Sequence, residues 1–371
     1  MDILLPVSLG EAIDKLTILD IKCEMITDSR KDDCKKEYDI LMDKLKDFVD
    51  NNKYYYDILK YINLQIWKDQ DIIRNLTNNE EIGKLSTKVL NDNDARFRIK
   101  KVINDLTNSS IKEQKGYNKK SAILITHHGM GDLINLNGAI RYLSILYDEL
   151  ILFVPNTPSY YTLNTIEMYK DIKNIEFFVC EKKLYTNYSK EMIESLVKKK
   201  VNKVYKTGYH LNYTFPCEIV PLSFYDQLNI DRKAMNVFFK LPVLSESQVL
   251  YNKVKDKEFI FCHLTGSQKE NSYPIEKINI DKKYLIIDIN TNRYPPDHEY
   301  YDLAQSLIKQ PMLHYMDIMK NAKEMYLINS SFYCLAGLLC KDIDQKRVCY
   351  CNANMSYIND YHAKFEFSNL N

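Results

Sequence analysis

The residue pattern of this chain changes once along its length, and that change restricts the folds it can adopt. Up to about residue 108, apolar residues recur at the three-to-four spacing of amphipathic helices. Beyond residue 120, short apolar runs alternate with helical stretches, which is typical of parallel sheets with crossover helices. We therefore expect an all-helical domain over residues 1–108, a polar linker over 109–120 and an α/β region after it.

The helical part carries one start signal and four apolar stripes. Ser8 and Glu11 have the spacing of a capping box, which predicts that a helix begins there. Each stripe predicts a helix with one buried face. The stripes are Ile13, Leu16, Leu19 and Cys23; Leu41, Leu45 and Phe48; Ile58, Ile62, Ile66 and Ile73; and Phe97, Ile99, Val102, Ile103 and Leu106.

The α/β region contains two successive series of strand and helix patterns. Strands are expected at 122–126, 150–154, 175–179 and 203–205, and again at 259–264, 284–287, 325–328 and 348–350. Helices are expected near 132–147, 158–170, 189–200, 311–321 and 330–340. These series predict a GT-B-like pair of Rossmann-type lobes, over residues 121–245 and 246–371.

Composition excludes several other classes of protein. The 51 Lys and Arg residues nearly balance the 50 Asp and Glu residues, so no net field attracts nucleic acid or an anionic membrane. No run approaches the roughly 20 apolar residues of a membrane span, and the first ten residues do not resemble a signal peptide. We expect a soluble, cytoplasmic protein. Its nine cysteines and seven histidines lack metal-site spacing, which favours free thiols and no bound metal.

A glycine turn follows the first expected strand of the α/β region. Gly129, Gly131 and Gly138 fall within ten residues, although the chain has only nine glycines. A strand, a tight turn and a helix in this order direct backbone N–H groups at a ligand above the sheet edge. The P-loop and dinucleotide spacings are absent, and an ordinary turn would also use these glycines. We predict that this loop contacts the acceptor or a phosphate through His128, Gly129, Met130 and Gly131.

Asp132 follows this turn, and two interpretations of it remain open. A carboxylate at the start of a helix is a favourable cap, worth about 0.5–2 kcal/mol. The same carboxylate at the mouth of a cleft is suited to accept a proton from an attacking hydroxyl, which typically accelerates a reaction about 10²–10⁴-fold. We predict the second role for Asp132.

Two further turns in the second series are candidates for phosphate binding. Asn329, Ser330 and Ser331 lie between an expected strand and a helix, where N–H groups and the helix dipole favour an anion. An ordinary serine cap explains the same residues. The turn after the strand at 259–264 adds hydroxyls and a cation, although an isolated lysine is usually just solvated. We assign donor binding to both turns, with Thr265, Gly266, Ser267 and Lys269 as the residues of the second.

Together the first two turns resemble the ADP-heptose lipopolysaccharide heptosyltransferase family, which has the GT-B fold. The resemblance covers about 120–355 and rests on Gly129–Asp132 with Ala139-Ile140-Arg141, and on Ile328–Ser331 with Leu335-Ala336. It implies an acidic base at Asp132 and contacts from Ser330 and Ser331 to the donor diphosphate. Thr265–Lys269 corresponds to a turn near that diphosphate. The chain has Asn329-Ser330-Ser331 where the family has Asp and Gly, and no histidine in the next helix, so we carry over only fold and reaction class.

Residues 1–117 separately resemble an uncharacterised family that is often found near glycan-related proteins. The matching pattern includes Pro6–Leu19, Trp67, Asp71 and Arg74, and Asn91–Arg96 with Lys100. This resemblance implies no activity. Its charged residues, such as Glu11, Asp14, Lys15 and Arg96, are expected to form interhelical salt bridges in preference to a site.

These patterns predict a glycosyltransferase that moves a sugar from a nucleotide-diphosphate-sugar to a glycan or other hydroxyl acceptor. The expected mechanism is inverting and metal-independent, with no cofactor beyond the nucleotide-sugar co-substrate. The alternative is a non-catalytic nucleotide- or glycan-binding scaffold of the same shape. An epimerase or reductase would need a dinucleotide fingerprint and a Tyr-x-x-x-Lys pair after a suitable strand, and neither is present.

Overall fold

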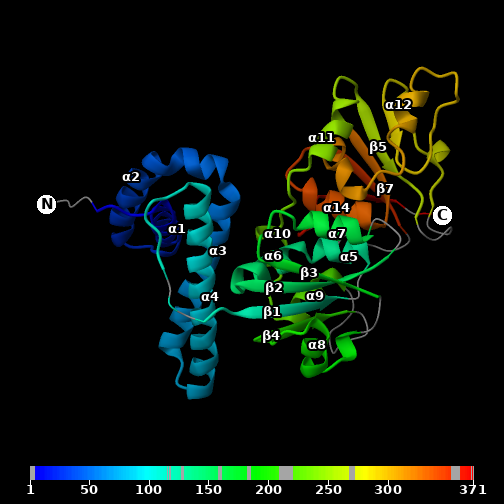
Figure 1. The fold of residues 1–371 in the computed structure, drawn as a ribbon. Coiled ribbons are helices and arrows are strands. Elements are labelled where there is room, and N and C mark those ends of the chain that lie inside the picture. The colour runs from blue at the N-terminus through cyan, green and yellow to red at the C-terminus, as the bar shows by residue number, and fades with distance from the viewer. Residues whose placement is uncertain are drawn as a thin grey trace. The chain divides into compact units, whose positions relative to one another are not determined.

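The computed structural model describes residues 5–114, 116, 118–126, 129–157, 161–181, 185–208, 220–266, 272–351, 360–368 and 370 (Figure 1). Its internal contacts divide the chain into two compact units. The helical unit comprises Met1–Lys120 and Arg141–Asp148, and the α/β unit comprises Ser121–Ile140 and Glu149–Asn371.

The helical unit is built from long helices, drawn in blue and cyan in Figure 1. They are α1 (Leu9–Met25), α2 (Arg30–Asn51), α3 (Lys53–Asn75) and α4 (Asn79–Leu106). Ser8 caps α1 as predicted, because its hydroxyl accepts a hydrogen bond from the Glu11 amide at 3.2 Å. The Glu11 side chain pairs with the Lys100 ammonium at 2.5 Å, so it stabilises the contact between α1 and α4.

The predicted stripes supply most of the core of this unit. Ile13, Leu16, Ile58, Ile62 and Ile103 are at most 1% exposed. The fourth stripe was drawn too wide, since Val102 and Leu106 are 38% and 52% exposed. Both residues lie within the last five positions of α4, which ends at Leu106.

The charged residues of the N-terminal pattern join helices to one another, as expected. Asp14 is buried on α1, and its carboxylate accepts hydrogen bonds from Asn63 at 2.9 Å and from Arg96 Nε at 2.8 Å. Thr17 completes this cluster by accepting from the same Asn63 amide at 2.9 Å. Lys15 pairs with Glu37 at 2.5 Å on the surface. A buried carboxylate needs such partners, so this cluster is accounted for by the packing of α1, α3 and α4.

The α/β unit contains two parallel sheets. The first has the strand order β3-β2-β1-β4, with β1 at Ser121–Thr126, β2 at Glu149–Pro155, β3 at Ile175–Cys180 and β4 at Lys203–Thr207. The second has the order β6-β5-β7-β8-β9, with β5 at Phe259–His263, β6 at Leu285–Asp288, β7 at Glu324–Ile328, β8 at Lys346–Tyr350 and β9 at Glu366–Ser368. All eight predicted strands form, and the expected pair of Rossmann-type lobes is confirmed.

Helices cover the faces of both sheets. The predicted helix near 132–147 is two helices, and those near 158–170, 189–200 and 330–340 form within the predicted limits (Figure 1). The sequence did not predict α9 to α12. The helices are α5 (Met130–Asn135), α6 (Asn137–Leu146), α7 (Tyr161–Met168), η1 (Tyr185–Asn187), α8 (Lys190–Val197), α9 (Val220–Leu228), α10 (Ala234–Val237), α11 (Ser245–Asn252), η3 (Ile275–Lys277), α12 (Tyr301–Gln305), η4 (Met312–Tyr315), α13 (Met316–Asn321) and α14 (Ser331–Leu339).

Each sheet has its own apolar core. Ile123 and Phe153 of the first sheet pack with Ile193 of α8. Cys262 and Tyr326 of the second sheet pack with Tyr284 before β6. Within the described residues, none of the helices combines the length and the apolar character that crossing a membrane requires.

Candidate active site

The two turns that the sequence singles out lie against each other. Gly131 belongs to α5, which follows β1, and Ser331 begins α14, which follows β7. A Cβ atom added to Gly131 would lie 3.1 Å from Cys334 Sγ and 3.4 Å from Ser331 Cα. The glycine therefore permits the start of α5 to approach the start of α14.

Close approach also explains a second glycine of the cluster. A Cβ atom at Gly138 would lie 2.2 Å from the carbonyl oxygen of Ala234, closer than any side chain tolerates. At Gly129 the same atom would make only an ordinary contact, 3.7 Å from Asp132 Oδ2. Packing thus requires a glycine at position 138 and favours one at position 131.

Asn135, at the end of α5, holds the two lobes together. Its amide nitrogen donates to Cys334 Sγ of α14 at 3.5 Å, and its amide oxygen lies 2.9 Å from His362 Nε2. Its backbone carbonyl accepts a hydrogen bond from the Tyr225 hydroxyl at 2.7 Å. Burial, assisted by the charge of Lys341, lowers the pKa of His362 to about 3, so this imidazole is neutral near pH 7.

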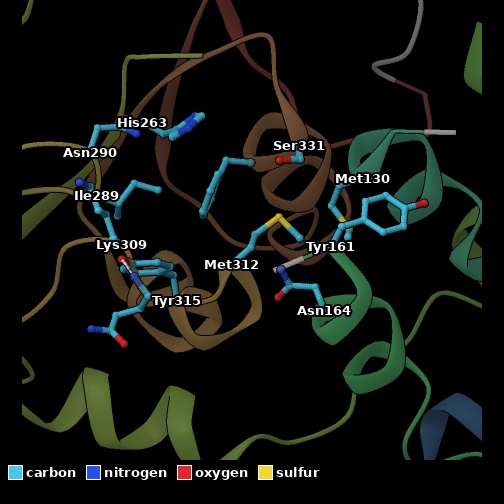
Figure 2. Close-up of a pocket in the computed structure, with 12 residues that line it drawn as sticks. Met130, Tyr161, Asn164, His263, Ile289, Asn290, Lys309, Met312, Tyr315 and Ser331 are labelled. Atoms are coloured by element: carbon cyan, nitrogen blue, oxygen red, sulfur yellow. Dashed lines mark hydrogen bonds between the residues drawn. The ribbon is translucent and has the colours of Figure 1, made fainter. Parts of the chain in front are cut away.

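A pocket of about 440 Å³ opens beside the paired turns. Its described lining residues follow the carboxyl ends of β1, β2, β5, β6 and β7 or belong to the segment before α13, so both lobes contribute. Figure 2 shows His263 and Asn290 on one side and Met130 and Tyr161 on the other. The lining residues are Met130, Tyr161, Asn164, His263, Ile289, Asn290, Lys309, Gln310, Met312, Tyr315, Ser331 and Phe332.

His263 is the buried titratable group of this pocket. It is the last residue of β5, it is 8% exposed, and its ring lies 4.6 Å from the ring of Phe332 between centroids. Its Nδ1 atom is 3.0 Å from the Ser330 hydroxyl, which therefore does not cap α14. Burial lowers the pKa of His263 to about 4, so the imidazole is uncharged near pH 7.

Asp132 acts electrostatically on both sides of the paired turns. Burial, and then the charge of Asp132, raise the pKa of Tyr161, which lines the pocket. The same two causes raise the pKa of Cys334 to about 12. The Asp132 carboxylate thus lies within electrostatic reach of the pocket wall and of α14.

The far wall of the pocket joins the lobes again and adds a cation. The Leu313 amide donates to Asn164 Oδ1 at 3.3 Å, which connects η4 to α7. Lys309 has a positive φ of 57° and is exposed, and its amide donates to the Ile289 carbonyl at 3.1 Å. Among the described lining residues there is no carboxylate, so the pocket is suited to an anionic ligand.

The predicted site residues reach this region to different extents. Met130 and Ser331 line the pocket, Ser330 bonds to a residue that lines it, and Asp132 acts on another. Gly129 is the N-cap residue of α5, and Gly131 lies in the first turn of that helix. The exposed Thr265 and Asn329 and the half-buried Gly266 are not lining residues. His128, Ser267 and Lys269 lie outside the described residues.

Sequence reasoning missed most of the polar lining. His263 and Asn290 had a usable signal. His263 lies near the end of the expected strand 259–264 and Asn290 just after the expected strand 284–287, where open α/β sheets bind ligands. Tyr161, Lys309 and Gln310 had no such signal. Tyr161 belongs to α7, and the other two belong to the connection between α12 and η4. Among the described residues, no group of three or more His, Cys, Asp or Glu side chains is arranged to hold a metal ion.

Comparison with known proteins gives one family match and two distant structural likenesses. The profile of a Family of unknown function (DUF6165) matches residues 3–135, which include the helices of the first unit as well as β1 and α5. No curated protein matches the chain in sequence. The two structures that we report are similar to this chain at low identity.

The first structure is E. coli heptosyltransferase WaaC with ADP. It is 11% identical, with a TM-score of 0.38, over 67% of this chain and 90% of that chain. The second is the bacterial iron-containing dodecameric glycosyltransferase TibC from enterotoxigenic E. coli. It is 12% identical, with a TM-score of 0.36, over 65% of this chain and 61% of that chain.

Proposed function

We propose that the α/β unit is a glycosyltransferase that moves a sugar from a nucleoside-diphosphate-sugar to a hydroxyl acceptor. One observation carries the proposal, the contact between the Gly131 turn of one lobe and the Ser331 turn of the other beside a shared pocket. In this arrangement the Asp132 carboxylate of α5 lies within electrostatic reach of Cys334 in the first turn of α14. The amino end of that helix favours an anion.

The proposed reaction moves one proton to the protein and leaves one electron pair on the diphosphate. In this proposal Asp132 accepts the proton of the acceptor hydroxyl as its oxygen forms a bond to the anomeric carbon. The bond from that carbon to the diphosphate oxygen breaks, and its electron pair remains on the diphosphate. Attack from the face opposite the leaving group inverts the anomeric configuration, and no metal ion takes part.

The negative charge that develops on the diphosphate needs fixed donors. The backbone amides of Ser331 and Phe332 at the start of α14, the Ser331 hydroxyl and the Lys309 ammonium are the donors that this pocket offers. Such groups are oriented before the reaction and are therefore effective at stabilising charge in the transition state. The lining without a described carboxylate supports an anionic donor.

The test is a transfer assay with the purified chain. A panel of UDP-, GDP- and ADP-sugars is incubated with the chain and mixed hydroxyl acceptors, and free nucleotide and glycosylated product are measured. We expect one donor to release its nucleotide faster with the chain than without it. If every donor remained intact while a nucleotide still bound, the chain would be a binding scaffold and the transferase proposal would be wrong.

A further inference from the structure

The imidazole of His263 is buried in the pocket wall with one nitrogen engaged. Its Nδ1 atom is bonded to the Ser330 hydroxyl at 3.0 Å, and its ring packs on Phe332. Among the described residues, no side chain or amide forms a hydrogen bond with its Nε2 atom. More than nine-tenths of the residue is buried, so Nε2 depends on whatever occupies the pocket for a partner.

The contact with Ser330 determines what Nε2 offers. A neutral imidazole carries one N–H donor and one acceptor, and the bond made by one nitrogen selects the role of the other. When the Ser330 hydroxyl donates to Nδ1, the proton of the ring is on Nε2. His263 then presents a neutral N–H donor to the pocket.

We propose that His263, positioned by Ser330, donates its Nε2 proton in a hydrogen bond to a phosphate oxygen of a bound diphosphate. This inference rests on the proposed function, because it takes the pocket to be the diphosphate site. Ser331 and Lys309 line the same pocket. The oxygens of one bound diphosphate would therefore be contacted by the neutral imidazole, a hydroxyl and a cation. His263 is a binding residue in this scheme, and Ser330 is a positioning residue.

A neutral donor suits this position for a physical reason. A fixed charge buried in an empty apolar wall is strongly unfavourable, whereas a neutral imidazole next to Phe332 is not. Once an anion binds, the N–H···O⁻ bond is charge-assisted and stronger than a neutral one. The wall therefore remains stable when empty and favours a phosphate when occupied.

The experiment measures inorganic pyrophosphate binding to the full chain by calorimetry. We expect His263→Phe, which keeps a packed ring without a donor, to weaken binding at least about tenfold. His263→Gln places an amide N–H near the Nε2 position and should retain affinity to within about threefold. The matched control is His298→Phe, because His298 also lies on an aromatic ring, Tyr294 at 4.4 Å, but is exposed and outside the pocket.

Ser330 provides a second test, because its role is to orient the imidazole. Ser330→Ala should weaken pyrophosphate binding several-fold, and Ser330→Thr, which restores the hydroxyl, should recover it. A role in folding alone would lower the melting temperature of Ser330→Ala and leave the affinity of the folded protein unchanged. That result would overturn the positioning role.

Wild-type pyrophosphate affinity in His263→Phe would overturn the proposal, and so would undetectable binding by the unmodified chain. The readout is separate from glycosyl transfer. If the chain binds pyrophosphate through His263 but transfers no sugar, the inference holds and the transferase proposal alone fails. If His263→Phe does not fold, the Ser330 pair of variants decides the question.

Discussion

Asp132 carries the most specific residue-level prediction. The N-cap of α5 is Gly129 and Asp132 lies inside the first turn, so the expected cap role of Asp132 is not what the structure shows. Asp132→Asn keeps the size of the side chain but removes its charge and its capacity to accept a proton. We expect the turnover number to fall about 10²–10⁴-fold while the Michaelis constant for the donor changes little. Steady-state kinetics with the donor found in the panel measures both constants.

The control for Asp132→Asn is Glu246→Gln. Glu246 is also an acidic residue in the first turn of a helix of the α/β unit, α11, and it is outside the pocket. Glu246→Gln should leave the turnover number and the Michaelis constant unchanged. Turnover by Asp132→Asn within threefold of the unmodified chain would reduce Asp132 to a carboxylate that only favours the helix dipole in the first turn of α5.

At the same scale, the sequence revealed the backbone of the site better than its side chains. The glycine and serine turns were found because scarce glycines and strand-turn-helix patterns leave a local trace. Asn164 and Gln310 leave no such trace, because amides are common on every surface. Their place in the pocket depends on contacts between lobes, such as the Leu313 amide with Asn164, which no local pattern encodes.

At the scale of elements, the packing of α6 against α10 depends on one glycine. Gly138→Ala would place a Cβ atom 2.2 Å from the Ala234 carbonyl oxygen, and a backbone carbonyl cannot move aside as a flexible side chain can. We expect a loss of about 3 kcal/mol in the free energy of unfolding. Urea denaturation of the variant and of Gly129→Ala measures it.

Gly129→Ala is the matched variant, because the added Cβ atom makes only an ordinary contact there. It should cost about 1 kcal/mol or less, the difference between glycine and alanine at a helix cap. Equal losses in the two variants would show that close helix approach is not what Gly138 provides.

The strands were predictable because parallel strands are buried on both faces and appear as continuous apolar runs. In β1 every residue from Ala122 to Thr126 is buried. β9 was missed because it has three residues, of which Glu366 and Ser368 are exposed. The predicted helix near 132–147 is interrupted at Leu136, where the chain turns from the contact with α14 toward the contact with α10.

For the whole molecule, acid is expected to lower stability through two buried imidazoles. The folded pKa values of His263 and His362 are lowered to about 4 and about 3, against 6.5 for an ordinary histidine. Between those values and 6.5 the unfolded chain binds more protons than the folded chain, so the free energy of unfolding falls as the pH falls. The full contribution is present above about pH 6.5.

Urea denaturation at pH 7.5 and pH 5.5 measures this effect. His263→Phe should lose about 1 kcal/mol less than the unmodified chain between these pH values, because one proton-binding group of the unfolded state is gone. Parallel losses in both proteins would mean that His263 is not held neutral by the fold.

The helical unit has its own stability determinant in the Asp14 cluster. Arg96→Ala removes the cationic partner of a carboxylate whose side chain is 3% exposed, which typically costs about 3–5 kcal/mol. Arg74→Ala is the control, since the pair of Arg74 with Asp71 is exposed and worth about 1 kcal/mol or less. Helix unfolding followed by circular dichroism in urea should distinguish the two. Equal midpoints would contradict the structural role of Asp14.

The hydrogen bond between Asn135 and His362 spans 227 positions of the sequence. After α5 has been synthesised, more than two hundred further residues must be added before His362 exists. Domains generally begin to fold during synthesis. The first sheet can therefore form early, with its loop edge still exposed to water and to chaperones. Only synthesis beyond β8 brings the imidazole that bonds to Asn135, so a nascent chain stalled before that point would carry a formed first sheet and an α5 without this partner.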